Sequence, residues 1–584
     1  MQTFGQLMLN QHLPEEHKFT DVAGKKEIYT KLTTMAKKDP YKYGDYVHHI
    51  KKVGDFFATN QGVSVGLDDI EPDYKNRDDI IRRAKKDLSK LKTYKAKQER
   101  LIRAQEEGIA LSKKHSGSLT HMADSGGRGS YGQLVKTLVA PITTKAPDDT
   151  PTDFLMSKSY SEGVSPSEMW MGATEARRET VRGQVSTSLP GDSSKQLVNT
   201  LNKVIVTKED CGTTNGLSLR TDDPNIIGRF TAGTNILITD HNINSYIKAN
   251  KTLKVRSPLT CEAQPGVCQK CYGIGSNDKM LSIGTNYGIR AAQAMSEPLT
   301  QMVLNSKHGG NVSTLGAELP RGMEGFRQVM DIPKIFKNES TLALQEGRVT
   351  SVDRMPHGGY TVTVGKKEHF VSPGRNVLVK RGDYVGKGDK ISDGVPNPKD
   401  VASLRGMGSG RKYLVDTLQS VYEDSGVRMD RRNLETLVRE NMNYVKATKS
   451  APDGSFLKHD IVPLNTIKPL IRKSSRKVDF NRNVIGKTLG EDFSYFTAGS
   501  KISPSMYDSM KEDDAKELYI TDEPPAYTPV VTALERVPSM SKDVIGRLAH
   551  RRLKDSLMEG ASRGYQTEIE KSPVAQYLFG GWGR

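Results

Sequence analysis

Apolar residues recur at helical spacing over several long stretches of this chain. Residues 77–107 are strongly charged with helical periodicity, which predicts one long helix or a pair of helices, although a solvated helix without a partner has the same pattern. Leu134, Leu138 and Val139 recur at helical spacing until Pro141 ends the pattern. The same periodicity predicts helices at residues 168–185, 286–305, 411–445 and 543–564.

Two other regions alternate short β-branched runs with turns. Residues 204–273 contain runs such as VIVT and ILIT and hold every cysteine of the chain, which predicts a small β-rich unit. Residues 347–394 consist of short strands separated by Gly and Asp turns, which predicts a small barrel or sandwich. We therefore predict an α+β fold with several domains, most of them helical.

The length and charge of the chain narrow its class. A chain of 584 residues is long enough for roughly three to five structural units. Its 86 Lys and Arg exceed its 69 Asp and Glu, and the net charge of +17 favours a polyanionic partner such as nucleic acid, although a solvated basic surface gives the same excess. No apolar run reaches the ~18 residues that span a bilayer, and the start lacks the segments of a secretion signal. We therefore expect a cytoplasmic protein with no membrane partner.

The four cysteines have the spacing of a metal site. Cys261, Cys268 and Cys271 form C-x6-C-x2-C in a turn-rich segment, and Cys211 lies in an earlier turn. Four thiolates suit one tetrahedral Zn2+ ion, and a site with no free ligand position is structural. Four unrelated buried thiols or a redox Cys-x-x-Cys pair are the alternatives, but the redox pair expects a βαβ context that is missing here.

Several segments resemble, in their order, the β′ subunit of multisubunit, bacterial-type DNA-directed RNA polymerase. GDFFATNQGVSVGLDDI at 54–70 resembles the stretch that leads into the rim helices of that family. HMADSGGRGSYGQLVKTLVAP at 121–141 is similar to its bridge helix, which spans the cleft beside the active site. IVTKEDCG and VRSPLTCEAQPGVCQKCYG resemble its zinc unit, with all four cysteines in ligand positions. YGIRAAQAMSEPLTQMVLNSKHGGN at 287–311 resembles its trigger loop.

The resemblance extends over most of the chain, weakly at 447–525. The family usually has Ala where Gly127 stands, and the chain departs from the family's bridge helix after Leu138. The predicted segments are residues 1–115 for the post-funnel segment and rim helices, 116–145 for the bridge helix, 146–203 for a following helical segment, 204–283 for the zinc-binding unit, 284–316 for the trigger loop, 317–395 for the barrel or sandwich, 396–450 for a helical segment near the cleft and jaw, 451–526 for a variable region and 527–584 for a clamp and switch segment.

One motif of the family is missing. The Asp-Phe-Asp-Gly-Asp loop that holds the catalytic Mg2+ in β′ subunits does not occur in the sequence, and residue 1 already matches a point downstream of it. The resemblance therefore implies a separate N-terminal β′ polypeptide that carries Mg2+, and a chain that is inactive alone. Split subunits of this kind occur in cyanobacteria, plastids and large bacteriophages. The length of the chain, without a large insertion after the trigger loop, favours the phage type, in the host bacterial cytoplasm.

The resemblance to the trigger loop assigns expected roles near an incoming nucleotide. His308 would donate a hydrogen bond or a proton to the phosphates, Leu304 would pack on the base, and Asn305 would hydrogen-bond a phosphate or the ribose without the charge of the family's Arg. Gln301 is grouped with them as a catalytic candidate. The alternatives are a solvent-facing loop histidine and an ordinary helix-face leucine.

A further set of residues is expected to bind template DNA and nascent RNA. Arg128 starts the predicted bridge helix, where it would face phosphates or pair with Asp124. The other candidates are Thr137, Leu138, Ala140, Arg177, Arg178, Arg182, Arg405, Arg411 and Lys412. Helix packing is the alternative for the three bridge residues, and a solvated surface is the alternative for each basic residue.

These expectations give one main function and two rivals. The main hypothesis is a subunit of a DNA-dependent RNA polymerase that acts with an N-terminal β′ polypeptide, β-type subunits and nucleoside triphosphates, with a specificity factor as a further candidate partner. The rivals are a non-catalytic, zinc-stabilised nucleic-acid-binding or transcription regulatory protein, and a purely structural scaffold.

Overall fold

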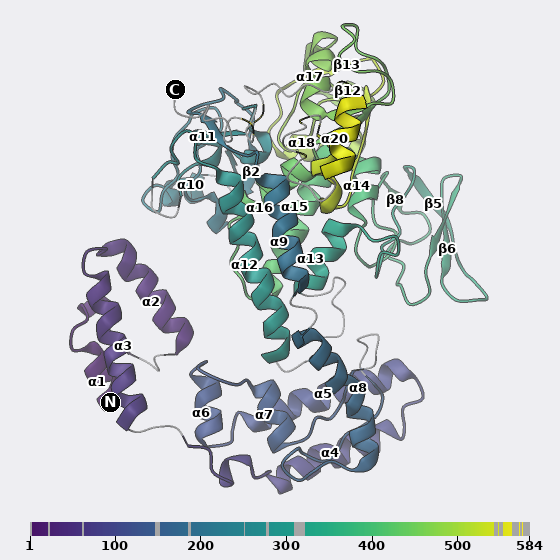
Figure 1. The fold of residues 1–584 in the computed structure, drawn as a ribbon. Helices are drawn as coiled ribbons and strands as arrows, with labels where there is room; N and C mark the ends of the chain where they lie inside the picture. The colour runs from purple at the N-terminus through teal and green to yellow at the C-terminus, as the bar shows by residue number, and fades with distance from the viewer. Residues whose placement is uncertain are drawn as a thin grey trace. The chain divides into compact units, whose positions relative to one another are not determined.

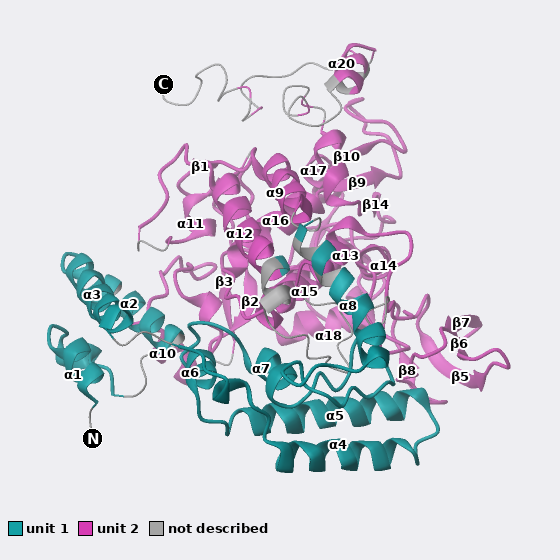
Figure 2. Cartoon of the chain, turned by 60° about the horizontal axis from the view of Figure 1, so that its bottom comes forward, with its two compact units in different colours: residues 1–187, 303–316 teal, residues 188–302, 317–584 magenta. Residues whose placement is uncertain are grey.

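The structure is a computed structural model in which two compact units are distinguished, residues 1–187 with 303–316 and residues 188–302 with 317–584 (Figure 2). The described residues are 3–20, 24–60, 64–145, 152–184, 188–249, 252–264, 266–275, 279–308, 322–541, 543, 547, 553–562, 564, 572 and 575. Predictions on residues 309–321, and on most of residues 542–552, lie outside the described residues.

The regular elements of the first unit are helices (Figure 1). They are α1 (Phe4–Asn10), α2 (Lys25–Lys38), α3 (Tyr43–Asn60), α4 (Tyr74–Leu88), α5 (Tyr94–Ser112), α6 (Ser118–Asp124), α7 (Tyr131–Leu138) and α8 (Pro166–Gln184). Residues 77–107, predicted as one long charged helix or a pair of helices, form the pair α4 and α5, which begin at the side-chain caps Asp73 and Thr93. Their buried faces form one apolar core with α7, in which Ile80, Leu101 and Val135 lie.

The segment at 121–141 forms two short helices and not one continuous helix. Helix α6 ends at Asp124 and α7 begins at Tyr131. Between them Gly126 and Gly129 have φ angles of +67° and +75°, a left-handed conformation that interrupts a right-handed helix. This break corrects the prediction of a single spanning helix, whereas the helix before Pro141 is confirmed.

The second unit mixes helices with small sheets (Figure 1). Its helices are α9 (Ser188–Leu201), α10 (Ile243–Ala249), α11 (Gln269–Tyr272), α12 (Tyr287–His308, whose last six residues belong to the first unit), α13 (Gly322–Asp331), α14 (Pro398–Arg405), α15 (Met407–Asp424), α16 (Arg431–Asn441), α17 (Leu464–Lys473), α18 (Pro504–Glu512) and α20 (Leu553–Ser562). Its strands are β1 (Val206–Lys208), β2 (Leu217–Arg220), β3 (Thr252–Val255), β4 (Val267–Cys268), β5 (Gly347–Arg354), β6 (Tyr360–Val364), β7 (Lys367–Val371), β8 (Tyr384–Val385), β9 (Tyr444–Ala447), β10 (Ile461–Pro463), β11 (Arg476–Asp479), β12 (Thr488–Leu489), β13 (Glu517–Thr521) and β14 (Tyr527–Pro529). The α+β fold class is confirmed.

The β-rich region predicted at 347–394 is a four-stranded antiparallel sheet in the order β7-β6-β5-β8. Alternate residues such as Val349, Val362 and Val364 face one apolar core, as expected for strands with one buried face. Isolated bridges, including Val377 with Ser392, pair residues that lie outside the four strands. Among the described residues, this region contains one four-stranded sheet where a small barrel or sandwich was predicted.

The helix predicted at 411–445 is two helices followed by a strand. Helix α16 starts at the cap Asp430, whose carboxylate accepts the backbone N–H of Arg432 at 2.9 Å. Residues 444–447 then form β9, which pairs with β10 and β14. At the start of α15 the GMGSG stretch has a packing role, since a side chain on Gly408 would collide with the backbone of Tyr495 and Phe496.

The weakly similar region 447–525 is folded. Strands β11, β13 and β12 form an antiparallel sheet, and residues such as Leu489, Met510 and Leu518 enclose an apolar core with α18. Among the residues that the structure describes, no helix combines the length and the apolar character needed to cross a bilayer.

Candidate functional site

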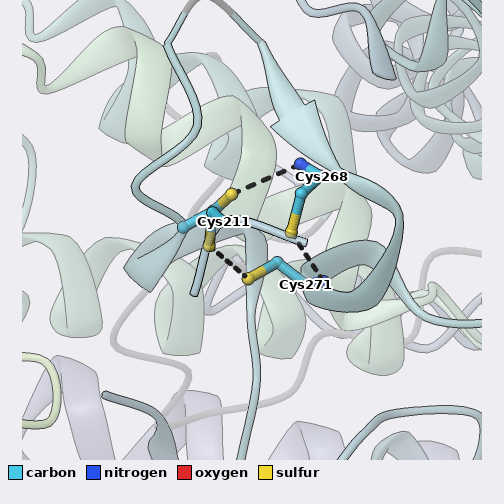
Figure 3. A group of neighbouring side chains, drawn as sticks. Cys211, Cys268 and Cys271 are labelled. Atoms are coloured by element: carbon cyan, nitrogen blue, oxygen red, sulfur yellow. Dashed lines mark hydrogen bonds between the residues drawn. The ribbon is translucent and has the colours of Figure 1, made fainter. Parts of the chain in front are cut away.

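The four cysteines converge although they come from separate segments of the second unit. Cys211 follows β1, Cys261 follows a short 3-10 helix at Pro258–Thr260, Cys268 ends β4 and Cys271 lies in α11. Their Sγ atoms all lie within 4.8 Å of one another. Those of Cys211 and Cys271, which are labelled with Cys268 in Figure 3, are 3.6 Å apart. The prediction that these residues form one set is confirmed.

Backbone groups hold the sulfur atoms in this arrangement. Cys261 Sγ accepts the N–H groups of Ala263 and Cys268, each at 3.4 Å, and Cys268 Sγ accepts the N–H of Cys271 at 3.3 Å. Hydrogen bonds from the other three thiols, that of Cys261 first, hold the pKa of Cys211 well below its usual range. The neighbouring thiols instead raise the pKa values of Cys261 and Cys271. The backbone N–H groups that donate to the sulfurs of Cys261 and Cys268 favour thiolate, which is the form of cysteine that binds metal.

The set fits a tetrahedral metal ion. Metal–sulfur bonds of ~2.3 Å in a tetrahedron place the sulfurs ~3.8 Å apart, close to the 3.6 Å between Cys211 and Cys271. Three of the four cysteines are buried, and Cys211 is half-buried. Among the described residues this is the only cluster of three or more His, Cys, Asp or Glu side chains placed to hold a metal. A closed set of four thiols leaves no position for a substrate, so the arrangement supports a structural role.

Helix α16 fixes the cysteine loops to the rest of the second unit. Arg432 Nη1 donates to the carbonyl oxygens of Tyr272 and Ile274 at 3.1 Å and 2.7 Å, directly after the last cysteine. Arg439 Nη2 donates to the carbonyl oxygen of Ala263 at 3.0 Å. The sequence prediction missed these roles, because charged residues at helical spacing after an Asp cap have the pattern of a solvated helix face.

A buried ion pair completes this attachment. Glu435 accepts two hydrogen bonds of 2.8 Å from Arg229, with both side chains fully buried, and a third of 2.7 Å from Ser257 Oγ. Because a buried charge is costly without its partner, the pair specifies how α16 and the cysteine-bearing loops meet.

The metal-binding loops also contact the start of α12. Tyr272 is next to Cys271, and Tyr287 is the first residue of α12. The centroids of their two rings are 4.3 Å apart. Tyr287 is buried, and its hydroxyl donates to Asn433 Oδ1 at 2.8 Å. Further along α12, the Met295 carbonyl accepts the hydroxyl of Tyr422 at 2.9 Å. The N-terminal part of α12 is therefore anchored to both the cysteine loops and helices α15 and α16.

The catalytic candidates lie on the C-terminal part of α12. Gln301 is exposed, and its Nε2 lies 3.4 Å from Glu297 Oε1. Leu304, Asn305 and His308 belong to the helix, but their side chains are outside the described part of the structure. Their predicted roles stay predictions.

The bridge-segment candidates separate into exposed and buried residues. Arg128 is exposed, and Asp124, its predicted alternative partner, instead accepts the hydroxyl of Tyr131, a bond that raises the pKa of that tyrosine to about 12. Leu138 and Ala140 are 3% and 0% exposed in the core shared with α4 and α5. Helix packing therefore accounts for these two side chains in this structure, and they offer no surface to a template. Thr137 is half-buried.

The basic candidates of the second unit are largely occupied by protein contacts. Arg411 is buried, and its Nε and Nη2 donate to the Met442 carbonyl at 3.0 Å and 2.7 Å, while burial lowers its pKa to about 10. The prediction that Arg411 binds a phosphate is corrected, because the side chain ties the end of α16 to α15. Arg405 is paired with Asp389, and Lys412 lies 2.8 Å from Asp416.

The arginines of α8 are described only in part. Arg177 is exposed, whereas the side chains of Arg178 and Arg182 lie outside the described residues. Glu168, near the start of α8, accepts the N–H groups of Ser157 and Ser165 at 2.6 Å and 2.8 Å. Burial alone would raise the pKa of Glu168, but these hydrogen bonds and those from the two serine hydroxyls outweigh burial and lower the pKa to about 2.

Replacing Glu168 with Gln is expected to destabilise the first unit by about 2 kcal/mol at neutral pH, because a buried charged acceptor is lost. Folding lowers the pKa of Glu168 from 4.5, so its contribution is complete above that value and declines as the pH falls towards about 2. Urea unfolding followed by the fluorescence of Trp170, in a Trp582→Phe background, measures the difference. An equal difference between wild type and variant at neutral pH and at about pH 3 would contradict this role.

Comparison with known proteins finds similarity to subunits of RNA polymerase. The family RNA polymerase Rpb1, domain 5, matches residues 163–357, a range that includes the four cysteines and α12. The chain is 27% identical over 520 residues to the DNA-directed RNA polymerase subunit beta' of Streptomyces avermitilis, which covers 79% of the chain and 39% of the relative. It is also 27% identical over 507 residues to that of Clostridium botulinum, covering 77% of the chain and 43% of the relative. The chain thus spans about two fifths of the length of these relatives.

Proposed function

We propose, from the premise that this chain corresponds to the C-terminal part of the β′ subunit of DNA-directed RNA polymerase, that it completes the catalytic centre of a multisubunit RNA polymerase. The observation that carries the proposal is the extent of the similarity, which reaches 79% of the chain. The proposed activity is nucleotidyl transfer, and the chain is inactive alone because its sequence lacks the loop that binds the catalytic magnesium in the family.

A separate N-terminal β′ polypeptide supplies Mg2+ in this proposal. The magnesium ions would bind the triphosphate and stabilise charge as pyrophosphate leaves. The present chain would contribute positioning, because aligning the reactants removes much of the barrier to transfer. Its other partners are one or more β-type subunits, template DNA, nascent RNA, nucleoside triphosphates and a specificity factor. A split β′ of this type fits a polymerase of a large bacteriophage.

The element that moves in this proposal is the C-terminal part of α12. Tyr287 and Tyr422 anchor the N-terminal part of the helix, whereas Gln301 is exposed. A helix that is anchored at its N-terminal part and exposed at Gln301 suits a segment that folds over a nucleotide and opens again. His308 then donates a hydrogen bond or proton to the phosphates, Leu304 packs on the base, and Asn305 binds a phosphate or the ribose with a neutral group.

The four cysteines are proposed to hold one structural Zn2+ ion. The donor set, the burial and the sulfur spacing fit zinc. The bound ion would stabilise the loops on which α11 and the start of α12 rest. Its role is structural, because all four ligand positions are taken.

Nucleic-acid contacts are proposed for the exposed candidates. Arg128 and Arg177 present charge at the surface of the first unit and are free to approach phosphates. Thr137, Arg178 and Arg182 belong to the same segments and are proposed with them. Arg405 and Lys412 each pair with an aspartate, and each would have to leave that partner to bind a phosphate. Their expected contribution to the affinity for nucleic acid is therefore smaller.

Affinity purification of the tagged full-length chain from cells that express its natural partners tests the proposal. We expect the mass spectrum to contain large chains that carry the Asp-Phe-Asp-Gly-Asp loop and a β-type subunit, in equal amounts with the bait. Recovery of the chain alone, or only with nucleic acid, would instead support the non-catalytic regulatory protein.

A further inference from the structure

Arg256 places a buried cation against the sulfur atoms of the cysteine cluster. Its side chain is 0% exposed. Its Nη2 atom lies 3.2 Å from Cys211 Sγ, 3.4 Å from Cys271 Sγ and 3.7 Å from Cys268 Sγ. On the other side of the guanidinium, Nη1 donates to Asn235 Oδ1 at 2.7 Å. One terminal nitrogen thus faces three of the four sulfurs while the other is held by the protein.

The carboxylate beside Arg256 does not neutralise both cations that contact it. Asp210 Oδ1 lies 2.7 Å from Arg256 Nη2, but the same carboxylate also accepts Lys270 Nζ at 2.9 Å and the N–H of Gly212 at 2.8 Å. One carboxylate is therefore shared between two cations. These three groups leave one net positive charge. A divalent ion with four thiolates carries two net negative charges, so a metal–thiolate centre would attract Arg256 and more than offset that positive charge.

We propose that Arg256 is a positioning and charge-compensating residue of the four-cysteine centre, and that it slows loss of the metal. The inference rests on the proposed Zn2+ occupancy. Nη2 carries two protons: one is directed to Asp210, and the other faces the sulfurs. Hydrogen bonds and a fixed positive charge beside the sulfurs would hold the thiolates in their ligand positions and so oppose loss of the ion.

Zinc release from the purified polymerase complex tests the inference. Wild type, Arg256→Gln, Arg256→Lys and Lys270→Gln are compared for zinc content and for the rate of transfer to a coloured chelator. We expect release about 10 to 100-fold faster for Arg256→Gln, an intermediate rate for Arg256→Lys, and a rate near that of wild type for Lys270→Gln, whose ammonium contacts Asp210 and no sulfur. Equal release rates for wild type and Arg256→Gln would overturn the inference.

A spectroscopic measurement separates this role from a general packing role. In Co2+-substituted protein the sulfur-to-cobalt charge-transfer band is expected to move to longer wavelength in Arg256→Lys, which keeps the charge but loses the planar donor group. An unchanged band would contradict hydrogen bonding to the sulfurs. Wild-type protein that binds no stoichiometric zinc would overturn the metal proposal itself, a result distinct from an unchanged release rate in a zinc-loaded variant.

Discussion

Replacing Cys271 with Ser is expected to abolish stoichiometric zinc binding and to unfold the segment that contains the cysteines. Structural zinc sites contribute about 10–16 kcal/mol of apparent binding free energy, far more than the ~1 kcal/mol of one hydrogen bond, so loss of one of four ligands removes most of the local stability. Zinc content and hydrogen exchange over residues 204–283 measure the effect. Glu262→Gln, which changes an exposed side chain next to Cys261, is the matched control and is expected to retain zinc.

The same substitution is expected to loosen the start of α12. Tyr272 follows Cys271, and its ring packs against the ring of the buried Tyr287. Unfolding of the loop would therefore remove this contact from Tyr287. Amide protection over residues 287–302 should therefore fall together with protection of the loop, whereas the sheet at 347–394 should be unaffected. Full protection of α12 in a zinc-free variant would show that α15 and α16 anchor the helix without the metal loops.

Replacing His308 with Ala is expected to slow single-nucleotide addition by the assembled enzyme about 100-fold at saturating nucleotide. A positioned proton donor contributes typically about 10²–10⁴-fold to a rate, and the neutral Asn305 offers no charge to replace it. His308→Gln keeps a hydrogen-bond donor but cannot transfer a proton, so an intermediate rate would identify hydrogen bonding as part of the role. Rapid-quench measurement on a preformed hybrid gives the rate directly.

Arg290→Gln is the control for this experiment. Arg290 is exposed near the anchored start of α12, far along the helix from His308, and its substitution is expected to leave the addition rate unchanged. If His308→Ala were as fast as wild type at saturating nucleotide, His308 would have no part in the chemical step.

The sequence predicted those features that depend on local pattern. The α4 and α5 pair, the helix at α8 and the four-cysteine set followed from periodicity and spacing, which local geometry determines. The end of α16 was placed too late, because residues 444–447 pair with strands that lie far along the chain.

Burial of charged and apolar residues could not be predicted in the same way. Arg411 and an exposed arginine have the same signature in a single sequence, and only the tertiary fold brings the Met442 carbonyl to its guanidinium. In the sequence, Leu138 and Ala140 are compatible both with packing against other helices and with contact to a template. The structure buries both side chains in the core shared with α4 and α5, which shows that they have a packing role. The approach of Arg256 to three thiols likewise depends on how distant loops meet.

Reconstitution of RNA synthesis tests the central claim most directly. The co-purifying chains are assembled with and without this chain on an RNA–DNA hybrid, and the extension of the RNA by one nucleotide is measured with Mg2+ present. We predict extension only by the complete assembly, and none by this chain alone. Full extension by the partner chains without it would contradict the account.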